Sequence, residues 1–189
     1  MSLQTTSSQT IGPYLHIGLT WLVTDNLAAP GVSGEKVAIE GRIVDGDGIA
    51  VNDAVVEIWQ ANAQGRYAHP EDTQDKPFES AFKGFGRVTT DNDGVFRFTT
   101  IKPGRVPAPG GGLQAPHLNV TIFTRGLLKH LITRMYFSNE RANDDDPVLQ
   151  RVPAERRQTL IATTSDEKSS VFKWKVILRG QGETVFFDY

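Results

Sequence analysis

The chain has 189 residues, a formal net charge of −2 and an apolar fraction of 39%, a composition typical of one ordinary folded domain. The small net charge gives no electrostatic footprint for nucleic acid or an anionic membrane. The absence of cysteine excludes disulfides, thiolate metal sites and cysteine nucleophiles. At the start of the chain, Met1–Thr10 has neither the basic nor the apolar region of a secretory signal, so we expect a cytoplasmic protein.

Short apolar runs, several with a two-residue alternation, follow one another along most of the chain and predict β-strands. Turns rich in Asp and Gly, such as Asp45–Gly48 and Asp91–Gly94, separate some of them. Both turns imitate the start of a calcium loop but lack its downstream glutamate, so we expect turn chemistry there. The predicted strands are Lys36–Val44, Ala54–Gln60, Val95–Ile101, Val120–Thr124, Leu131–Phe137, Val171–Leu178 and, as an edge strand, Thr184–Tyr189.

Helix signals are few. Pro153–Ala162 has a proline suited to the first helical position and Glu155 in the first turn, which predicts one short helix. Seven or eight strands with at most one or two short helices indicate an all-β fold, an antiparallel β-sandwich with Pro/Gly-rich loops. We expect a single domain over residues 1–189, with residues 1–35 as an N-terminal arm that contains the structure-breaking dipeptide Gly12–Pro13.

A loop rich in proline and glycine, Pro103–Pro116, leads directly into an apolar strand. Proline fixes φ and glycine permits left-handed backbone, so such a loop has a defined shape. At its end, His117 and Asn119 are two residues apart, and two residues at this spacing on a strand point to the same face. Two histidines there would form half of a metal site, but one of the pair is an asparagine.

Two further residues each have two interpretations. Tyr67 follows a predicted strand; its phenolate would suit a hard cation such as Fe(III), whereas a ring packed at the base of a loop needs no metal. Arg134 lies in an otherwise apolar strand, where a guanidinium must pair or reach solvent. The pattern favours a structural ion pair, and the alternative is a clamp that binds a carboxylate through two hydrogen bonds.

Several motifs, each weak by itself, occur in an order and spacing that resemble the intradiol ring-cleaving dioxygenases over nearly the whole chain. The similarity is to the α chains of two-subunit members of this family. It implies a β-sandwich whose active site lies between two different subunits. The motifs are Ser8–Tyr14, Glu57–Ala61, Gly65–Tyr67, Thr100–Gly104, Ala115–His117, Thr133–Phe137 and Gly182–Asp188.

The iron-bearing members of this family hold non-haem Fe(III) with two tyrosines and two histidines. At the matching positions this chain keeps Tyr67 and His117, but has Val106 and Asn119 where the second tyrosine and second histidine would stand. Valine has no donor atom, and a neutral amide is a poor substitute for imidazole. The resemblance therefore implies that this chain holds no metal and that Fe(III) is held by a partner β subunit with all four ligands.

The resemblance also implies a reaction and a division of labour. The reaction is cleavage of 3,4-dihydroxybenzoate between its hydroxyl groups with O2, giving 3-carboxy-cis,cis-muconate. In a hetero-oligomer of αβ units, this chain would contribute an arm and a strand arginine to the substrate pocket of the partner. The implied substrate-binding residues are Thr10, Gly12, Pro13, Tyr14 and Arg134.

Two alternatives stay open from the sequence. One is a single-chain intradiol dioxygenase acting on catechols, against which Val106 and Asn119 count. The other is a β-sandwich binding module with no catalytic role, for which export would be expected and no signal sequence is seen.

Overall fold

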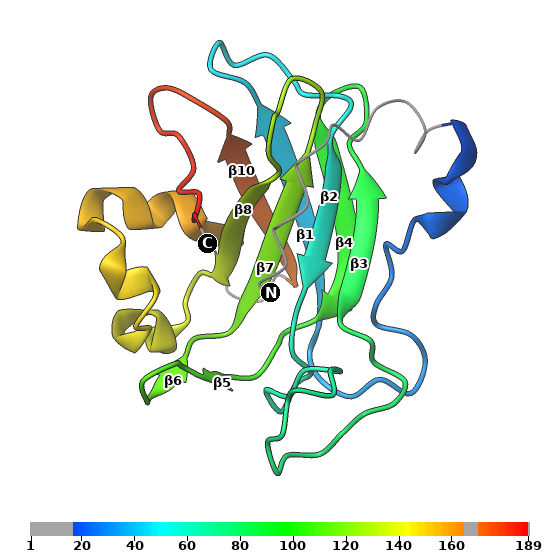
Figure 1. Ribbon diagram of the computed structural model, residues 1–189, viewed down its shortest axis with the longest axis vertical. Coiled ribbons are helices and arrows are strands. Elements are labelled where there is room, and N and C mark those ends of the chain that lie inside the picture. Colours follow the sequence, from blue (N-terminus) through cyan, green and yellow to red (C-terminus); the bar gives the residue numbers. More distant parts are fainter. Residues whose placement is uncertain (1–16, 165–169, 189) are drawn as a thin grey trace, which may run out of the picture.

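The computed structural model describes residues 17–164 and 170–188, and these form an eight-stranded sheet folded into two layers (Figure 1). The front layer holds β3, β2, β7 and β8, and the back layer holds β9, β10, β1 and β4. The all-β sandwich predicted from the sequence is confirmed. The strands are β1 (Lys36–Val44), β2 (Val55–Trp59), β3 (Phe85–Thr89), β4 (Val95–Ile101), β7 (His117–Phe123), β8 (Leu131–Phe137), β9 (Ile161–Thr164) and β10 (Val171–Ile177).

Most neighbouring strands in the sheet are antiparallel, but two pairs are parallel: β1 with β10 and β8 with β9. A parallel connection cannot be a tight hairpin and needs a longer crossover. Between β8 and β9 this crossover carries three short 3₁₀ helices, drawn at the left of Figure 1, that cover the outer face of the front layer near β8. The residues of this crossover therefore pack against β8 in a second, smaller apolar cluster outside the core of the sandwich.

The helices are short, as expected, but more numerous than the one or two predicted. The described residues contain four 3₁₀ helices: η1 (Thr20–Leu22), η2 (Arg141–Asp145), η3 (Leu149–Arg151) and η4 (Ala154–Leu160). The helix predicted over Pro153–Ala162 is η4, and it ends at Leu160 because Ile161 and Ala162 already pair with β8. No helix in the described part of the chain is long and apolar enough to cross a membrane.

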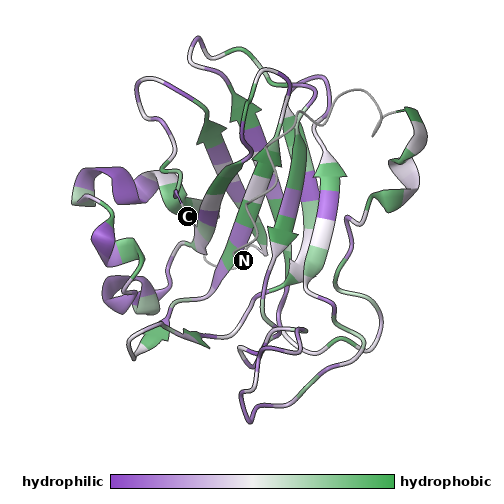
Figure 2. Cartoon of the chain, viewed as in Figure 1, coloured by the Kyte–Doolittle hydropathy of each residue, from purple (hydrophilic) through white to green (hydrophobic). Residues whose placement is uncertain are grey.

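The core between the two layers comes from the side chains that alternate inward along the strands. Figure 2 shows this alternation of hydrophobic and hydrophilic residues along the strands. On β7, for example, Leu118, Val120 and Ile122 are buried against the back layer. Gly41 of β1 also faces inward, and a Cβ there would collide with the ring of Phe96, so glycine is required for that ring to cross the strand.

The segment that precedes β1 closes the open side of the sandwich, between β3 and β4. Thr24 exchanges backbone hydrogen bonds with Arg87 of β3 (2.8 and 3.0 Å). Two residues on, Asn26 bridges to Thr99 of β4, and the backbone of Leu27 donates to the Thr99 carbonyl at 2.7 Å. From Thr24 onward the segment is thus part of the folded unit, although it belongs to the region 1–35 described above as an arm.

The edge strand predicted over Thr184–Tyr189 is wrong for the residues described. The segment 184–188 crosses from the end of β10 to β8: Thr184 donates its backbone N–H to Ile177 at 3.0 Å, and Phe187 forms one isolated bridge with Ile132. A chain that changes partner within four residues cannot form a ladder along either strand. Its alternating hydrophobic residues pack against β8 and η4 instead.

The sequence does not predict strand β3 (Phe85–Thr89), because Gly84 precedes it and Gly86 interrupts its pattern. A Cβ on Gly86, the second residue of β3, would press on Leu27 and Phe98, so the close approach of the N-terminal segment requires the glycine. The two Asp/Gly turns, in contrast, are confirmed as turns. Asp45 and Asp91 each accept backbone N–H groups two and four residues ahead.

Candidate functional site

The Pro/Gly loop forms a small two-stranded ribbon beside the entrance of β7 (Figure 1). Its strands are β5 (Val106–Pro107) and β6 (Leu113–Gln114), and the turn between them is closed by a hydrogen bond from Ala108 to the Gly112 carbonyl at 3.1 Å. Gly110, Gly111 and Gly112 all have positive φ, so this turn depends on glycine. The sequence prediction of a shaped loop is confirmed.

His117 begins β7 and is buried, with 3% of its surface exposed. Its Nδ1 lies 2.7 Å from the Ala115 carbonyl, so the tautomer with a proton on Nδ1 donates there and leaves the lone pair on Nε2. No described residue gives Nε2 a hydrogen-bond partner. Burial, assisted by the charge of Arg134, lowers the His117 pKa from 6.5 to about 4, so the ring is neutral near pH 7.

Asn119 and Tyr67 contact each other directly. The Asn119 Nδ2 donates to the Tyr67 hydroxyl oxygen at 3.2 Å and lies 3.3 Å from the Trp59 carbonyl. The Tyr67 ring is stacked on Trp59, with ring centroids 5.8 Å apart. The ring therefore packs on Trp59 at the base of a loop, and the phenol oxygen accepts a hydrogen bond from Asn119.

The residues present do not fit a ferric ion. The cleft of about 420 Å³ that Tyr67 and Val106 line offers one phenol, and Val106, 3% exposed, adds only hydrocarbon. Asn119 turns an N–H donor, not a lone pair, toward the phenol oxygen. Within residues 17–164 and 170–188, no cluster of three or more His, Cys, Asp or Glu could hold a metal. The Nε2 of His117 is the one buried imidazole nitrogen among the described residues that has no hydrogen-bond partner.

Arg134 lies directly opposite Asn119 on the neighbouring strand, and its guanidinium reaches the ribbon. One terminal nitrogen donates to the Gln114 side-chain oxygen at 2.6 Å, and the Gln114 amide nitrogen donates to the Pro107 carbonyl at 2.8 Å. Gln114 lines the cleft of Tyr67 as well as a second cleft, of about 580 Å³, that Arg134 lines. The ribbon thus holds Gln114 between two adjoining clefts.

Asp146, a residue that the sequence did not single out, organises the region outside β8. It is fully buried, and its carboxylate accepts hydrogen bonds from the backbone of Ala115 (2.6 Å), Val148 (2.9 Å) and Leu149 (2.7 Å) and from the Tyr136 hydroxyl (3.2 Å). These bonds tie the end of the ribbon to η3. Burial, with the nearby Asp146 charge, raises the pKa of the Tyr136 phenol, which therefore stays protonated and can donate.

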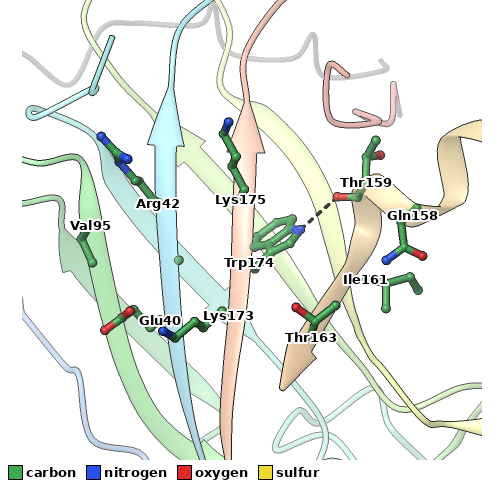
Figure 3. Close-up of a pocket in the computed structure, with 11 residues that line it drawn as sticks. Glu40, Arg42, Val95, Gln158, Thr159, Ile161, Thr163, Lys173, Trp174 and Lys175 are labelled. Carbon is green, nitrogen blue, oxygen red and sulfur yellow. Dashed lines mark hydrogen bonds between the residues drawn. The ribbon is translucent and has the colours of Figure 1, made fainter. Parts of the chain in front are cut away.

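An open groove on the outer face of the back layer has no comparable chemistry. Figure 3 shows its lining, where Arg42, Lys173 and Lys175 project from adjoining strands and are exposed. The Trp174 indole N–H is already used by the Thr159 carbonyl at 3.0 Å. Exposed cations on a strand surface are strongly hydrated and screened, so we assign the candidate site to the two clefts at the ribbon.

The structure places five of the residues singled out from the sequence in one region. His117 and Asn119 lie on β7, Arg134 on β8, Val106 on β5 of the ribbon, and Tyr67 in the loop after β2. The other four, Thr10, Gly12, Pro13 and Tyr14, lie outside the described residues.

Sequence reasoning missed Gln114, Asp146 and Arg151, each of which lines a cleft or holds one in place. Gln114 stands three residues before His117, a proximity that could have drawn attention to it. Asp146 follows two exposed aspartates, and nothing in the sequence separates it from them.

Comparison with known proteins agrees with this geometry. A protein-family model described as Dioxygenase matches residues 22–180. The chain is 43% identical to the protocatechuate 3,4-dioxygenase alpha chain of Burkholderia cepacia, over 99% of this chain and 98% of the relative. It is also 35% identical to the protocatechuate 3,4-dioxygenase beta chain of Burkholderia cepacia, over 80% of this chain and 67% of the relative.

Among solved structures, 3-chlorocatechol 1,2-dioxygenase from Rhodococcus opacus superposes with a TM-score of 0.64 at 20% sequence identity, covering 94% of this chain and 68% of that one. At this identity the match is evidence for the fold alone. The family model and the full-length relative establish more than the fold. The chain belongs to the intradiol dioxygenase family.

Proposed function

We propose that this chain is the α subunit of a cytoplasmic protocatechuate 3,4-dioxygenase. The reaction cleaves the carbon–carbon bond between the two hydroxyl-bearing carbons of 3,4-dihydroxybenzoate and adds both atoms of O2, giving 3-carboxy-cis,cis-muconate. The proposal is supported by similarity over the full length of an α-chain relative, and by the separate match to a β chain. It makes this chain one part of an oxidoreductase.

In this proposal Fe(III) is held by the partner β subunit of a hetero-oligomer of αβ units. The observation that carries it is the state of the ligand positions: Val106 has no donor, and Asn119 directs an N–H toward the Tyr67 oxygen. A single-chain catechol dioxygenase would need four ligands in this chain, and the residues present supply two.

The chain's own contribution is to position the substrate. Thr10, Gly12, Pro13 and Tyr14 are proposed to reach the substrate pocket of the partner, where glycine permits close approach and proline stiffens the arm. Arg134 is proposed to bind the substrate carboxylate through its planar guanidinium. Its bond to Gln114 supports this role, because it fixes the guanidinium before any ligand arrives.

Co-expression with a β subunit tests the proposal. We expect a stable complex that contains about one Fe(III) for each αβ unit and cleaves 3,4-dihydroxybenzoate with O2 uptake. The chain expressed by itself should hold no stoichiometric iron and show no tyrosinate-to-iron colour. One tightly held Fe(III) with ring-cleavage activity in the chain alone would instead establish a single-chain enzyme.

Arg134→Ala in the assembled enzyme tests the carboxylate contact. We expect kcat/KM for 3,4-dihydroxybenzoate to fall about ten- to a hundred-fold, because a charge-assisted bidentate bond is lost, while the value for catechol changes far less. Arg141→Ala, an exposed arginine on η2, is the matched control. Equal losses for both substrates would contradict the contact.

A further inference from the structure

The outer face of the back layer gathers positive charge in one groove, which we call the cationic groove. Arg42 of β1, and Lys173 and Lys175 of β10, line it and are exposed (Figure 3). One carboxylate, that of Glu40, also lines it and already pairs with Arg97 at 3.2 Å. In the whole chain Asp and Glu outnumber Lys and Arg by 22 to 20, so this face is opposite in sign to the molecule.

Two of these cations are neighbours on adjacent strands. Arg42 lies opposite Lys175 in the parallel pairing of β1 with β10, and the Arg42 Nε donates to the Asp93 carbonyl at 3.0 Å. In the described part of the chain, neither cation forms an ion pair with a carboxylate. Like charges on neighbouring strands repel each other, and carboxylates from another molecule would relieve that repulsion. The groove therefore favours a partner that presents more than one negative charge.

The chain itself presents a pair of carboxylates of this kind. Asp144 and Asp145 end η2, are both exposed, and form no ion pair with another described residue. Among the described residues, no other two consecutive acidic residues are both exposed. The one cation of η2, Arg141, stands at the opposite end of this helix. Asp144 and Asp145 thus form an acidic corner on the crossover.

The acidic corner and the cationic groove adjoin each other. A hollow of about 620 Å³ beside η2 is lined by Asp144 and by Gln158 of η4, and Gln158 also lines the cationic groove. Arg157, a cation that lines the hollow, already donates to two backbone carbonyls of the crossover. Positive charge therefore lies to one side of Gln158 and negative charge to the other. A surface of this kind is complementary to a second copy of itself turned by a two-fold rotation.

We propose that two copies of this chain associate through this face, with the acidic corner of each copy seated in the cationic groove of the other. The two contacts are equivalent by symmetry, so the pairing closes at two copies. Gln158 and Thr163, both exposed, add hydrogen-bonding side chains across the groove from the cations. The inference does not depend on the proposed function. In an assembly of αβ units, the same contact would join two units through this chain.

Sedimentation of the full chain, expressed by itself, tests the pairing. We expect a dimer whose dissociation constant rises about tenfold between about 0.05 and 0.5 M NaCl, because salt screens exposed charges. Lys175→Glu and Asp145→Lys should each weaken the dimer about a hundred-fold, since each change brings like charges together at both contacts. Lys129→Glu and Asp75→Lys, at exposed residues outside the groove and the hollow, are the matched controls and should leave the dimer unchanged.

A mixture of the two reversed variants separates this contact from any other. In a mixed pair, the groove with Lys175→Glu faces the corner with Asp145→Lys, and the unchanged groove faces the unchanged corner. We expect the mixture to form a dimer although neither variant does so alone. A monomeric wild-type chain at low salt, a dimer that both variants leave intact, or a mixture that stays monomeric would overturn the proposal.

Neutral variants keep the proposal testable if a reversed variant does not fold. Lys175→Gln and Asp145→Asn should each weaken the wild-type dimer about three- to tenfold, because each removes one exposed ion pair from both contacts. Unchanged dimers in both neutral variants would overturn the proposal in the same way.

Discussion

The front layer of the sandwich is covered on both faces, and different interactions stabilise the packing on each face. Its inner face packs into the core through many apolar side chains, such as Leu118 and Ile122. Its outer face, near β8, is covered by η2–η4 around a smaller apolar cluster that includes Tyr136 and Leu149. There one carboxylate, Asp146, accepts four hydrogen bonds. A large core distributes its stability, whereas a small one concentrates it in a polar residue.

The strongest test of this contrast is Asp146→Ala. We expect a loss of about 4 kcal/mol in the free energy of unfolding, because buried backbone N–H groups of Ala115 and Leu149 lose their acceptor. Urea denaturation measures it. Asp146→Asn should cost less, since the amide oxygen can still accept from η3. Asp145→Ala, at an exposed neighbour, should stay within about 0.5 kcal/mol of wild type.

The second test uses pH. The His117 pKa is 6.5 when unfolded and about 4 when folded, so in this interval the unfolded chain binds a proton that the folded chain does not. The contribution of neutral His117 to the free energy of unfolding is fully present above about pH 6.5. It decreases as the pH drops to about 4, by about 3 kcal/mol in total. The difference in unfolding free energy between wild type and His117→Gln should show this fall. A pH-independent difference would mean that His117 titrates normally.

The third test concerns the inner core. Gly41→Ala should lower the free energy of unfolding by about 2 kcal/mol, because the new methyl group collides with the Phe96 ring. Thermal unfolding measures the change. The double variant with Phe96→Leu should recover part of the loss, and Gly18→Ala, where a Cβ meets nothing within 4 Å, is the control. A double variant no more stable than Gly41→Ala would contradict the collision.

The smallest effect is expected on the uncovered outer face of the back layer. Arg97 pairs with Glu40 at 3.2 Å and Asp91 at 3.4 Å, but its side chain is 61% exposed. Exposed ion pairs are solvated and screened, so Arg97→Ala should change the free energy of unfolding by less than about 1 kcal/mol. Urea denaturation at low and high salt measures the change. A loss larger than about 1 kcal/mol would show that burial does not explain why the hydrogen bonds of Asp146 stabilise the fold more than the exposed ion pairs of Arg97.

Much of the fold could be predicted because strand alternation is local. Alternation predicts six of the strands, and the spacing of His117 and Asn119 predicts that these two residues share a face of β7. β3 was missed because Gly86 serves a contact with residues 24–27, far away in sequence. Thr184–Tyr189 was misread because its alternation serves packing against η4 and β8 instead of a ladder.

The sequence by itself determined most strand positions and the β-sandwich class, since each depends on residue type and on spacing within one segment. The tertiary structure decided that the Asn119 amide donates to the Tyr67 oxygen and that Arg134 and Arg151 line one cleft. It also decided that Asp146, among three successive aspartates, is the buried one. These are contacts between distant segments, and no local pattern encodes which side chains a crossover brings together.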